Sequence, residues 1–182
     1  MSTTLEIDPN LTMAELLERF PGAQRALFRQ YHIGGCSSCG FQPTETLAQV
    51  CARNNDLPLD DVIEFLQSSH QADQQMQISP AELDALLKTG AAPKLVDVRT
   101  REEYDAVHLK DALLFTQEMM QEMLSTWSRT EPVVMVCHHG IRSMDAAAYF
   151  AGHGFTNVKS LTGGIDQWSQ EIDPSLPRYH LE

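Results

Sequence analysis

The chain has 182 residues, of which 42% are hydrophobic, and its formal net charge is −12. A chain of this size accommodates one ordinary domain, or a small domain followed by a medium one, and its apolar content is sufficient for a core. The excess of acidic side chains repels nucleic-acid phosphates and anionic membrane surfaces, so we expect neither as a partner.

The first residues, MSTTLEIDPNLTMAELL, lack the basic stretch and the long apolar run of a secretory signal. No other run is long and apolar enough to span a membrane. The four cysteines are too few for a disulfide-stapled secreted scaffold. We therefore expect a cytoplasmic protein, in which a CxxC pair is more often a redox or metal site than a permanent disulfide.

Residues 1–67 are predicted to form a small all-helical domain. Thr12 and Glu15 have the T-x-x-E spacing of a capping box, and apolar residues follow at helical intervals. Further amphipathic helices are expected over 22–31, 44–55 and 59–67. The stretch 68–77, SSHQADQQMQ, is polar and lacks a clear period, which predicts a linker.

Residues 78–176 alternate between strand and helix patterns, and residues 177–182 are expected to be a tail. Ser79 is predicted to cap a helix that has Pro80 at its first position. Apolar strands are expected over 94–98, 112–115, 132–136 and 157–161, and later helices over 116–127, 143–154 and 164–170. This alternation predicts an α/β domain with a central parallel sheet, in which sites collect at the carboxyl ends of strands.

The segment CHHGIRS, residues 137–143, joins the strand 132–136 to the helix that follows. Cys137 therefore stands at the carboxyl end of a strand and close to a helix N-terminus, where backbone N–H groups and the helix dipole favour a thiolate. Gly140 permits the backbone angles of a tight anion-binding loop. Arg142 supplies a positive charge, and Ser143 is the expected N-cap. These features predict a reactive thiolate inside a small anion-binding loop.

Two alternatives concern the same loop. A cysteine after an apolar strand, taken alone, is more often a buried structural residue than a reactive one. The two histidines either add positive charge when protonated or face solvent. The predicted substrate- and anion-binding residues are His138, His139, Gly140, Ile141, Arg142 and Ser143.

CHHGIRS resembles the active-site loop of rhodanese-like sulfurtransferases, and the resemblance extends over residues 78–173. LVDVRTREEYDAVHL (95–109) resembles the family's D-x-R…E-[FY]-x-x-x-H-[IL] segment, and LTGGIDQW (161–168) is similar to its closing L-x-G-G-x-x-x-W. The matching residues of the first segment are Asp97, Arg99, Glu103, Tyr104 and His108. HLKDA (108–112) departs from the common H-I-P-G-A, which places the local turn in question.

The resemblance implies a mechanism. Cys137 would take one sulfur atom from a sulfane-sulfur donor such as thiosulfate, and the persulfide would pass it to a thiol or to cyanide. Main-chain N–H groups of the loop would stabilise the persulfide anion. The residues Asp97, Arg99, Glu103 and His108 are expected to be scaffold, with a charged pair linking the strand to the following helix. We expect no cofactor and no catalytic metal.

Two other functions compete with sulfur transfer. Cysteine-dependent phosphatases and arsenate reductases also hold a thiolate in an anion-binding loop, but their loops follow Cys-x5-Arg. Four residues separate Cys137 from Arg142 here, and the smaller loop suits a sulfur atom better than a tetrahedral phosphate. The non-enzymatic alternative is a binding or sulfur-carrier module whose CxxC domain recruits a partner. An intact cysteine loop favours the enzyme.

The N-terminal half has its own cysteine cluster. Cys36 and Cys39 form a CxxC pair that indicates either a dithiol–disulfide switch or half of a metal site completed by Cys51 and a ligand such as His32. Cys51 lies in the apolar phase of a helix, which favours a packed cysteine.

Residues 11–67 are similar to small helical redox-disulfide domains associated with hybrid-cluster proteins. The similarity rests on TMAELLERFPGAQRAL, the Gly-Cys-x-x-Cys turn and LDDVIEFL. It implies a reversible Cys36–Cys39 disulfide and a thiol-redox protein as a possible partner. A further hypothesis is that this pair accepts sulfur from Cys137 or reduces its persulfide.

Overall fold

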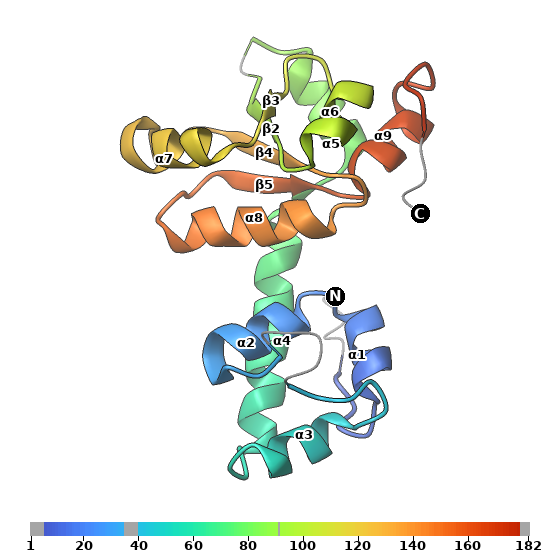
Figure 1. Cartoon of the computed structure of the whole chain (residues 1–182), viewed down its shortest axis with the longest axis vertical. Helices are drawn as coiled ribbons and strands as arrows, with labels where there is room; N and C mark the ends of the chain where they lie inside the picture. Colours follow the sequence, from blue (N-terminus) through green and yellow to red (C-terminus); the bar gives the residue numbers. More distant parts are fainter. Residues whose placement is uncertain (1–5, 35–39, 91, 179–182) are drawn as a thin grey trace. The chain divides into compact units, whose positions relative to one another are not determined.

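Figure 1 shows the computed structural model of the chain, which describes residues 6–34, 40–90 and 92–178. The chain divides into two compact units, Met1–Gln75 and Met76–Glu182. The first unit is helical, and the second contains a sheet with helices on both faces.

The N-terminal unit consists of α1 (Met13–Arg19), α2 (Ala23–Tyr31), α3 (Leu47–Arg53) and α4 (Leu59–Gln75) among its described residues. Thr12 caps α1 in the predicted capping box with Glu15, and Thr46 forms the same box with Gln49 at α3. An isolated antiparallel bridge joins Thr12 to Thr46 and brings the two helix starts together. The largest fully buried side chains of this unit are Ile7, Met13, Leu16, Leu27, Leu47, Val50 and Leu66.

The predicted linker over 68–77 contains the boundary between the two units, but most of it is helical, so the prediction of an irregular segment is wrong. Helix α4 continues through Gln75, and Gln77, the last residue of the stretch, begins the sheet. Beyond Leu66 the helix buries a carboxylate rather than an apolar side chain, because Asp73 Oδ2 accepts a hydrogen bond from Arg25 Nη2 of α2 at 2.6 Å. A partly buried charged pair leaves no apolar period in the sequence, and the segment therefore resembles a linker.

The second unit contains a parallel five-stranded sheet in the order β1-β5-β4-β2-β3. Its strands are β1 (Gln77–Ile78), β2 (Lys94–Asp97), β3 (Leu113–Leu114), β4 (Val133–Val136) and β5 (Val158–Leu161). The four predicted strands and the parallel α/β class are confirmed. Strand β1 was not predicted because two residues are too few to show alternation. Strand β4 lies at the centre of the sheet, so its carboxyl end is flanked by β5 and β2.

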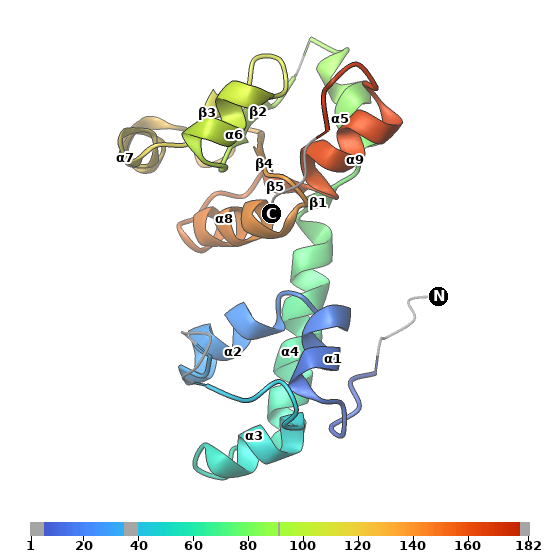
Figure 2. The same cartoon turned by 45° about the vertical axis from the view of Figure 1, so that its right-hand side comes forward.

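Both faces of this sheet are covered by helices, as Figure 2 shows. The helices are α5 (Pro80–Leu87), α6 (Arg101–Ala106), α7 (Gln117–Thr126), α8 (Ile141–Gly152) and α9 (Gly164–Glu171). Successive residues of β4 point to opposite faces: Val134 packs with Leu83 of α5 and Trp168 of α9, and Met135 packs with Phe150 of α8 and Met123 of α7. Strands buried on both faces read as continuous apolar runs, as VVMV does.

Candidate active-site loop

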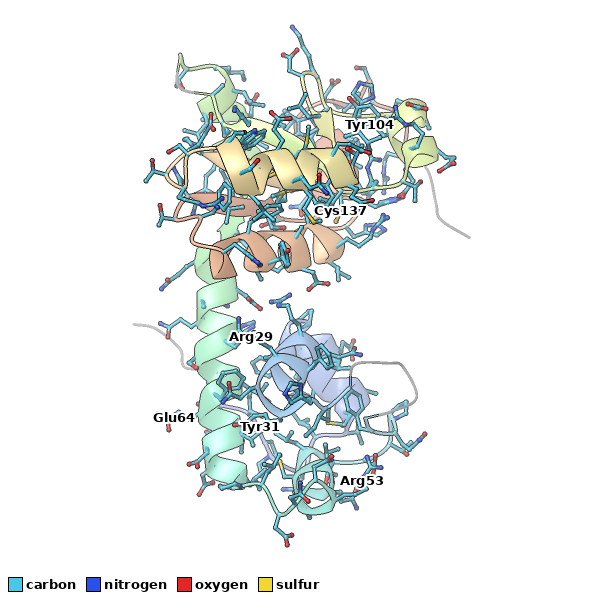
Figure 3. The ribbon with its side chains drawn as sticks, turned by 60° about the vertical axis from the view of Figure 1, so that its left-hand side comes forward. Arg29, Tyr31, Arg53, Glu64, Tyr104 and Cys137 are labelled. Carbon is cyan, nitrogen blue, oxygen red and sulfur yellow. The ribbon has the colours of Figure 1, made fainter. Side chains whose placement is uncertain are left out.

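Cys137 follows the last residue of β4, and its side chain is labelled in Figure 3. The residue is only 1% exposed and has a free thiol. Burial of this kind also fits a structural cysteine, so the polar atoms around the sulfur decide how the position is interpreted.

Two polar groups from the following segment reach the sulfur. Gly140 N–H donates to Cys137 Sγ over 3.1 Å, and the hydroxyl Oγ of Ser143 lies 3.2 Å from the same sulfur. Gly140 has φ +88°, and a Cβ there would come within 3.0 Å of Gly163 N and Leu161 O, so both the angle and the space favour glycine. The predicted donation from the loop backbone to sulfur is therefore present at Gly140.

The prediction that Ser143 caps α8 is wrong. Gly140 is the N-cap of this helix and Ser143 lies inside its first turn. The Ser143 side chain is buried, and its Oγ also lies 2.8 Å from Ser160 Oγ on β5. Sequence reasoning missed Ser160, whose only signal was a serine inside the apolar strand pattern NVKSL.

Arg142 does supply a cation next to the loop, but its guanidinium is paired. Its Nη1 and Nη2 donate to the two carboxylate oxygens of Glu103 over 2.9 and 2.8 Å. Glu103 is a buried residue of α6 whose Oε2 also accepts the backbone N–H of Thr100. The loop is therefore less positive than predicted, and the pair ties the start of α8 to the start of α6.

The two loop histidines differ in environment. His138 is 2% exposed, whereas His139 is exposed, and their ring centroids lie 4.0 Å apart. Burial, followed by the nearby His139, lowers the pKa of His138 below its ordinary value. His138 thus fits neither alternative, since it does not face solvent and its neutral form is favoured. Ile141 is 61% exposed at the start of α8.

Backbone hydrogen bonds from the first turn of α9 hold the backbone of the loop in place. Ile165 N–H donates to Cys137 O over 2.9 Å, and Asp166 N–H donates to His138 O over 3.2 Å. Gly164 makes this approach possible, because a Cβ there would lie 2.3 Å from Cys137 O and 2.4 Å from His138 O. The glycine pair of LTGGIDQW therefore shapes the site without contacting the sulfur.

The Asp97–Arg99 pair forms part of the framework beside the loop, as predicted. Arg99 Nε donates to Asp97 Oδ1 over 2.9 Å, and its Nη2 donates to Asp97 Oδ2 and to Val107 O over 2.6 and 2.7 Å. Both charged side chains have no exposed surface. Their contacts join the end of β2 to the residue that follows α6, which is the expected strand-to-helix link.

Two further residues of the 95–112 segment are also structural. The His108 ring stacks on Tyr104 with centroids 4.0 Å apart, and the Tyr104 hydroxyl donates to Ala112 O over 2.6 Å. The segment that differs from H-I-P-G-A still forms a turn, in which Asp111 adopts the left-handed φ of +63° at the glycine position.

Cys36 and Cys39 lie outside the described residues. Cys51 is buried in α3, and burial raises the pKa of its thiol, which agrees with a packed helix cysteine. Within the described ranges, no group of three or more His, Cys, Asp or Glu side chains is arranged to hold a metal ion. None of the helices described is long and apolar enough to cross a membrane.

Comparison with known proteins matches residues 79–171 to the family described as Rhodanese-like domain. The thiosulfate sulfurtransferase GlpE of Pseudomonas savastanoi pv. phaseolicola is 35% identical over 92 residues, which are 50% of this chain and 85% of GlpE. The adenylyltransferase and sulfurtransferase UBA4 of Candida albicans is 25% identical over 162 residues, 79% of this chain. This chain spans only 34% of the length of UBA4.

Among solved structures, reduced CoADR-RHD of Bacillus anthracis is similar with a TM-score of 0.51. The match covers 78% of this chain and 23% of that one, at 17% sequence identity. Identity at this level supports a shared fold only.

Proposed function

The chain belongs to the rhodanese-like domain family, and we propose that it is a sulfurtransferase that carries sulfane sulfur as a persulfide on Cys137. Relatives named as sulfurtransferases support sulfur transfer in general. Thiosulfate as donor, a thiol or cyanide as acceptor, and the cytoplasm as location are the finer parts of this proposal.

The reaction has two displacement steps. The Cys137 thiolate attacks the sulfane sulfur of thiosulfate, the sulfur–sulfur bond of the donor breaks, and sulfite leaves with the bonding electron pair. An acceptor thiolate or cyanide then attacks the outer sulfur, and Cys137 leaves as a thiolate. The balanced products are a new persulfide or thiocyanate, together with the original enzyme.

The observation that carries the proposal is the convergence of Gly140 N–H and Ser143 Oγ on Cys137 Sγ at the end of β4. A buried inert cysteine needs no such polar groups around its sulfur, whereas a thiolate is stabilised when the Gly140 N–H and the Ser143 hydroxyl donate to it. The Cys-x4-Arg spacing and the engagement of Arg142 by Glu103 also favour sulfur transfer over phosphatase or arsenate reductase chemistry, in which the arginine must bind a tetrahedral anion.

Steady-state sulfur transfer from thiosulfate to cyanide tests this function. The purified chain is expected to form thiocyanate catalytically, and Cys137→Ser is expected to form none. Cys51→Ser serves as the matched control, because Cys51 is also a buried free thiol but belongs to the helical unit and not to the unit that contains Cys137. A single round of sulfur uptake without turnover on cyanide or any thiol would favour the sulfur-carrier alternative.

For the helical unit, the proposal is that Cys36 and Cys39 reduce the Cys137 persulfide. One thiolate of the pair would attack the outer sulfur of the Cys137 persulfide, and the second would then displace hydrosulfide. The products are a Cys36–Cys39 disulfide, a Cys137 thiolate and hydrosulfide, so two thiols reduce one sulfane sulfur. A Cys36→Ser/Cys39→Ser variant that uses every thiol acceptor at the normal rate would rule this step out.

A further inference from the structure

Ser160 places a buried hydroxyl behind the active-site sulfur. It lies on β5, is 1% exposed, and its Oγ is 2.8 Å from Ser143 Oγ, which in turn is 3.2 Å from Cys137 Sγ. The Ser160 hydroxyl also lies 3.4 Å from the carbonyl oxygen of Gly140. Three contacts thus form a chain from the sulfur to a carbonyl that can only accept.

The number of protons in this chain depends on the state of the sulfur. With Cys137 as a thiol, three hydrogens serve three contacts: the thiol donates to Ser143, Ser143 donates to Ser160, and Ser160 donates to Gly140 O. All hydroxyls then point away from the sulfur, and no hydroxyl hydrogen stabilises it.

With Cys137 as a thiolate, only two hydrogens remain for the three contacts. The thiolate is best stabilised when Ser143 donates to it, and Ser143 Oγ must then accept from Ser160 because two oxygens 2.8 Å apart need one hydrogen between them. The contact given up is the one from Ser160 to Gly140 O, which at 3.4 Å is the longest and weakest of the three.

We propose that Ser160 is a positioning residue that turns the Ser143 hydroxyl toward the Cys137 thiolate. Ionisation releases the thiol proton to solvent, and both hydroxyls rotate so that Ser160 donates to Ser143 and Ser143 donates to sulfur. Donation to an ion is stronger than donation between neutral groups, and each bond in a chain strengthens the next. Removal of the Ser160 hydroxyl should therefore destabilise the thiolate form of Cys137 more than the thiol form.

This inference rests on the proposed role of Cys137 as a nucleophile, but its test measures the ionisation of the Cys137 thiol and not sulfur transfer. The rate at which iodoacetamide alkylates Cys137 is measured across pH in the full chain, with the Cys137 peptide quantified by mass spectrometry. We expect Ser160→Ala to raise the pH midpoint of alkylation by about 0.5 pH unit, the scale of one cooperative hydrogen bond. Ser160→Thr, which keeps the hydroxyl, is expected to restore the original midpoint.

A double substitution separates this role from a packing effect. In a Ser143→Ala background, Ser160→Ala is expected to leave the midpoint unchanged, because Ser160 acts through Ser143. Ser169→Ala is the matched control, since Ser169 is a buried serine whose hydroxyl donates to Asp166 O outside this chain of contacts. An unchanged midpoint in Ser160→Ala, or an equal shift in both backgrounds, overturns the proposal.

Other ionisable groups near the loop are the same in all of these variants, so they do not account for a difference between them. They are His138 and His139 on the loop, Arg142 on α8, Glu103 on α6, Asp166 on α9 and Arg99 beyond β2. The alkylation readout does not require sulfur transfer. A chain that transfers no sulfur but shows the midpoint shift would retain the Ser160 role and refute only the proposed function.

Discussion

Groups from the loop, α8, β5 and α9 surround Cys137. The loop supplies Gly140 N–H, the first turn of α8 supplies Ser143, and β5 supplies Ser160 behind it. The start of α9 fixes the carbonyl of Cys137 itself. A single fixed geometry of the nucleophile is a condition for efficient displacement, so these contacts support the role proposed for Cys137.

His138 makes stability depend on pH near neutrality. Burial lowers the pKa of this imidazole below 6.5, so the unfolded chain takes up its proton at a higher pH than the folded chain does. The free energy of unfolding should therefore be unaffected by this residue above about pH 6.5 and should fall as pH decreases toward the folded pKa.

Urea unfolding at several pH values checks this expectation for His138→Gln. In the wild type the free energy of unfolding should decrease as the pH falls below 7. In the variant this decrease should be smaller, because the proton uptake of one histidine on unfolding is lost. His153→Gln, at the exposed end of α8, is the control and should keep the full decrease. Identical pH profiles for the wild type and His138→Gln would contradict the account.

Asp111 tests the backbone of the turn before β3. Its φ of +63° is tolerated by aspartate, costs glycine nothing and is strained for a β-branched residue. We expect Asp111→Gly to stay within about 1 kcal/mol of the wild type and Asp111→Val to lower the free energy of unfolding by about 1–3 kcal/mol. Equal stabilities in urea titrations would mean that the turn does not need this conformation, since the side chain is exposed in either case.

At the scale of elements, the Glu103–Arg142 pair joins α6 to α8. Glu103 is buried and Arg142 is partly exposed, so removal of the arginine leaves a buried carboxylate without its bidentate partner.

Substitution of this pair should destabilise the second unit. Glu103→Gln is expected to lower the free energy of unfolding by about 1–3 kcal/mol, and Arg142→Gln by a similar or larger amount, because it leaves the buried carboxylate charged and unpaired. The double variant should cost less than the sum of the two. Arg101→Gln is the control, because its contact with Asp105 is exposed and 3.8 Å long. Strict additivity in a double-mutant cycle would show that the two side chains do not act as a pair.

The elements of the sheet could be predicted from sequence because their local signals are strong. VVMV is a continuous apolar run, and four capping boxes mark helix starts at Thr12, Thr46, Ser79 and Thr100. The failures have physical causes as well. Strand β1 is too short to show a period, and the end of α4 buries Asp73 in place of an apolar side chain.

The candidate site was predictable only in part for a related reason. The loop, its glycine and its nucleophile are contiguous in sequence, so their spacing is visible. The contacts of Ser143 with Ser160 and of Arg142 with Glu103 join residues 17 and 39 positions apart, and neither leaves a local pattern. The N-cap assignment of Ser143 failed because Gly140, already left-handed, starts the helix earlier.

On the scale of the whole molecule, the two units have separate cores. The core of the first unit consists of residues from Ile7 to Leu66, and the two cores of the second consist of residues from Ile78 to Trp168. Among the residues that the structure describes, the two hydroxyl side chains in the series of contacts that starts at Cys137 Sγ, Ser143 and Ser160, both belong to the second unit.

Residues 76–182 are therefore expected to fold without the helical unit. The isolated segment should unfold in a single cooperative transition and keep the alkylation profile of Cys137, because its core and loop contacts are internal. Circular dichroism and urea titration check the fold. A segment that stays unfolded or aggregates at all urea concentrations would show that the helical unit contributes to the core.

The intact mass of the reduced full chain after thiosulfate treatment tests the central claim most directly. The account predicts a gain of one sulfur atom in the wild type, lost on addition of cyanide, and no gain in Cys137→Ser. A gain in both proteins would place the sulfur on Cys36 or Cys39 instead. If neither protein gains sulfur from thiosulfate or from any other sulfane-sulfur donor, the proposal that Cys137 carries a persulfide is contradicted.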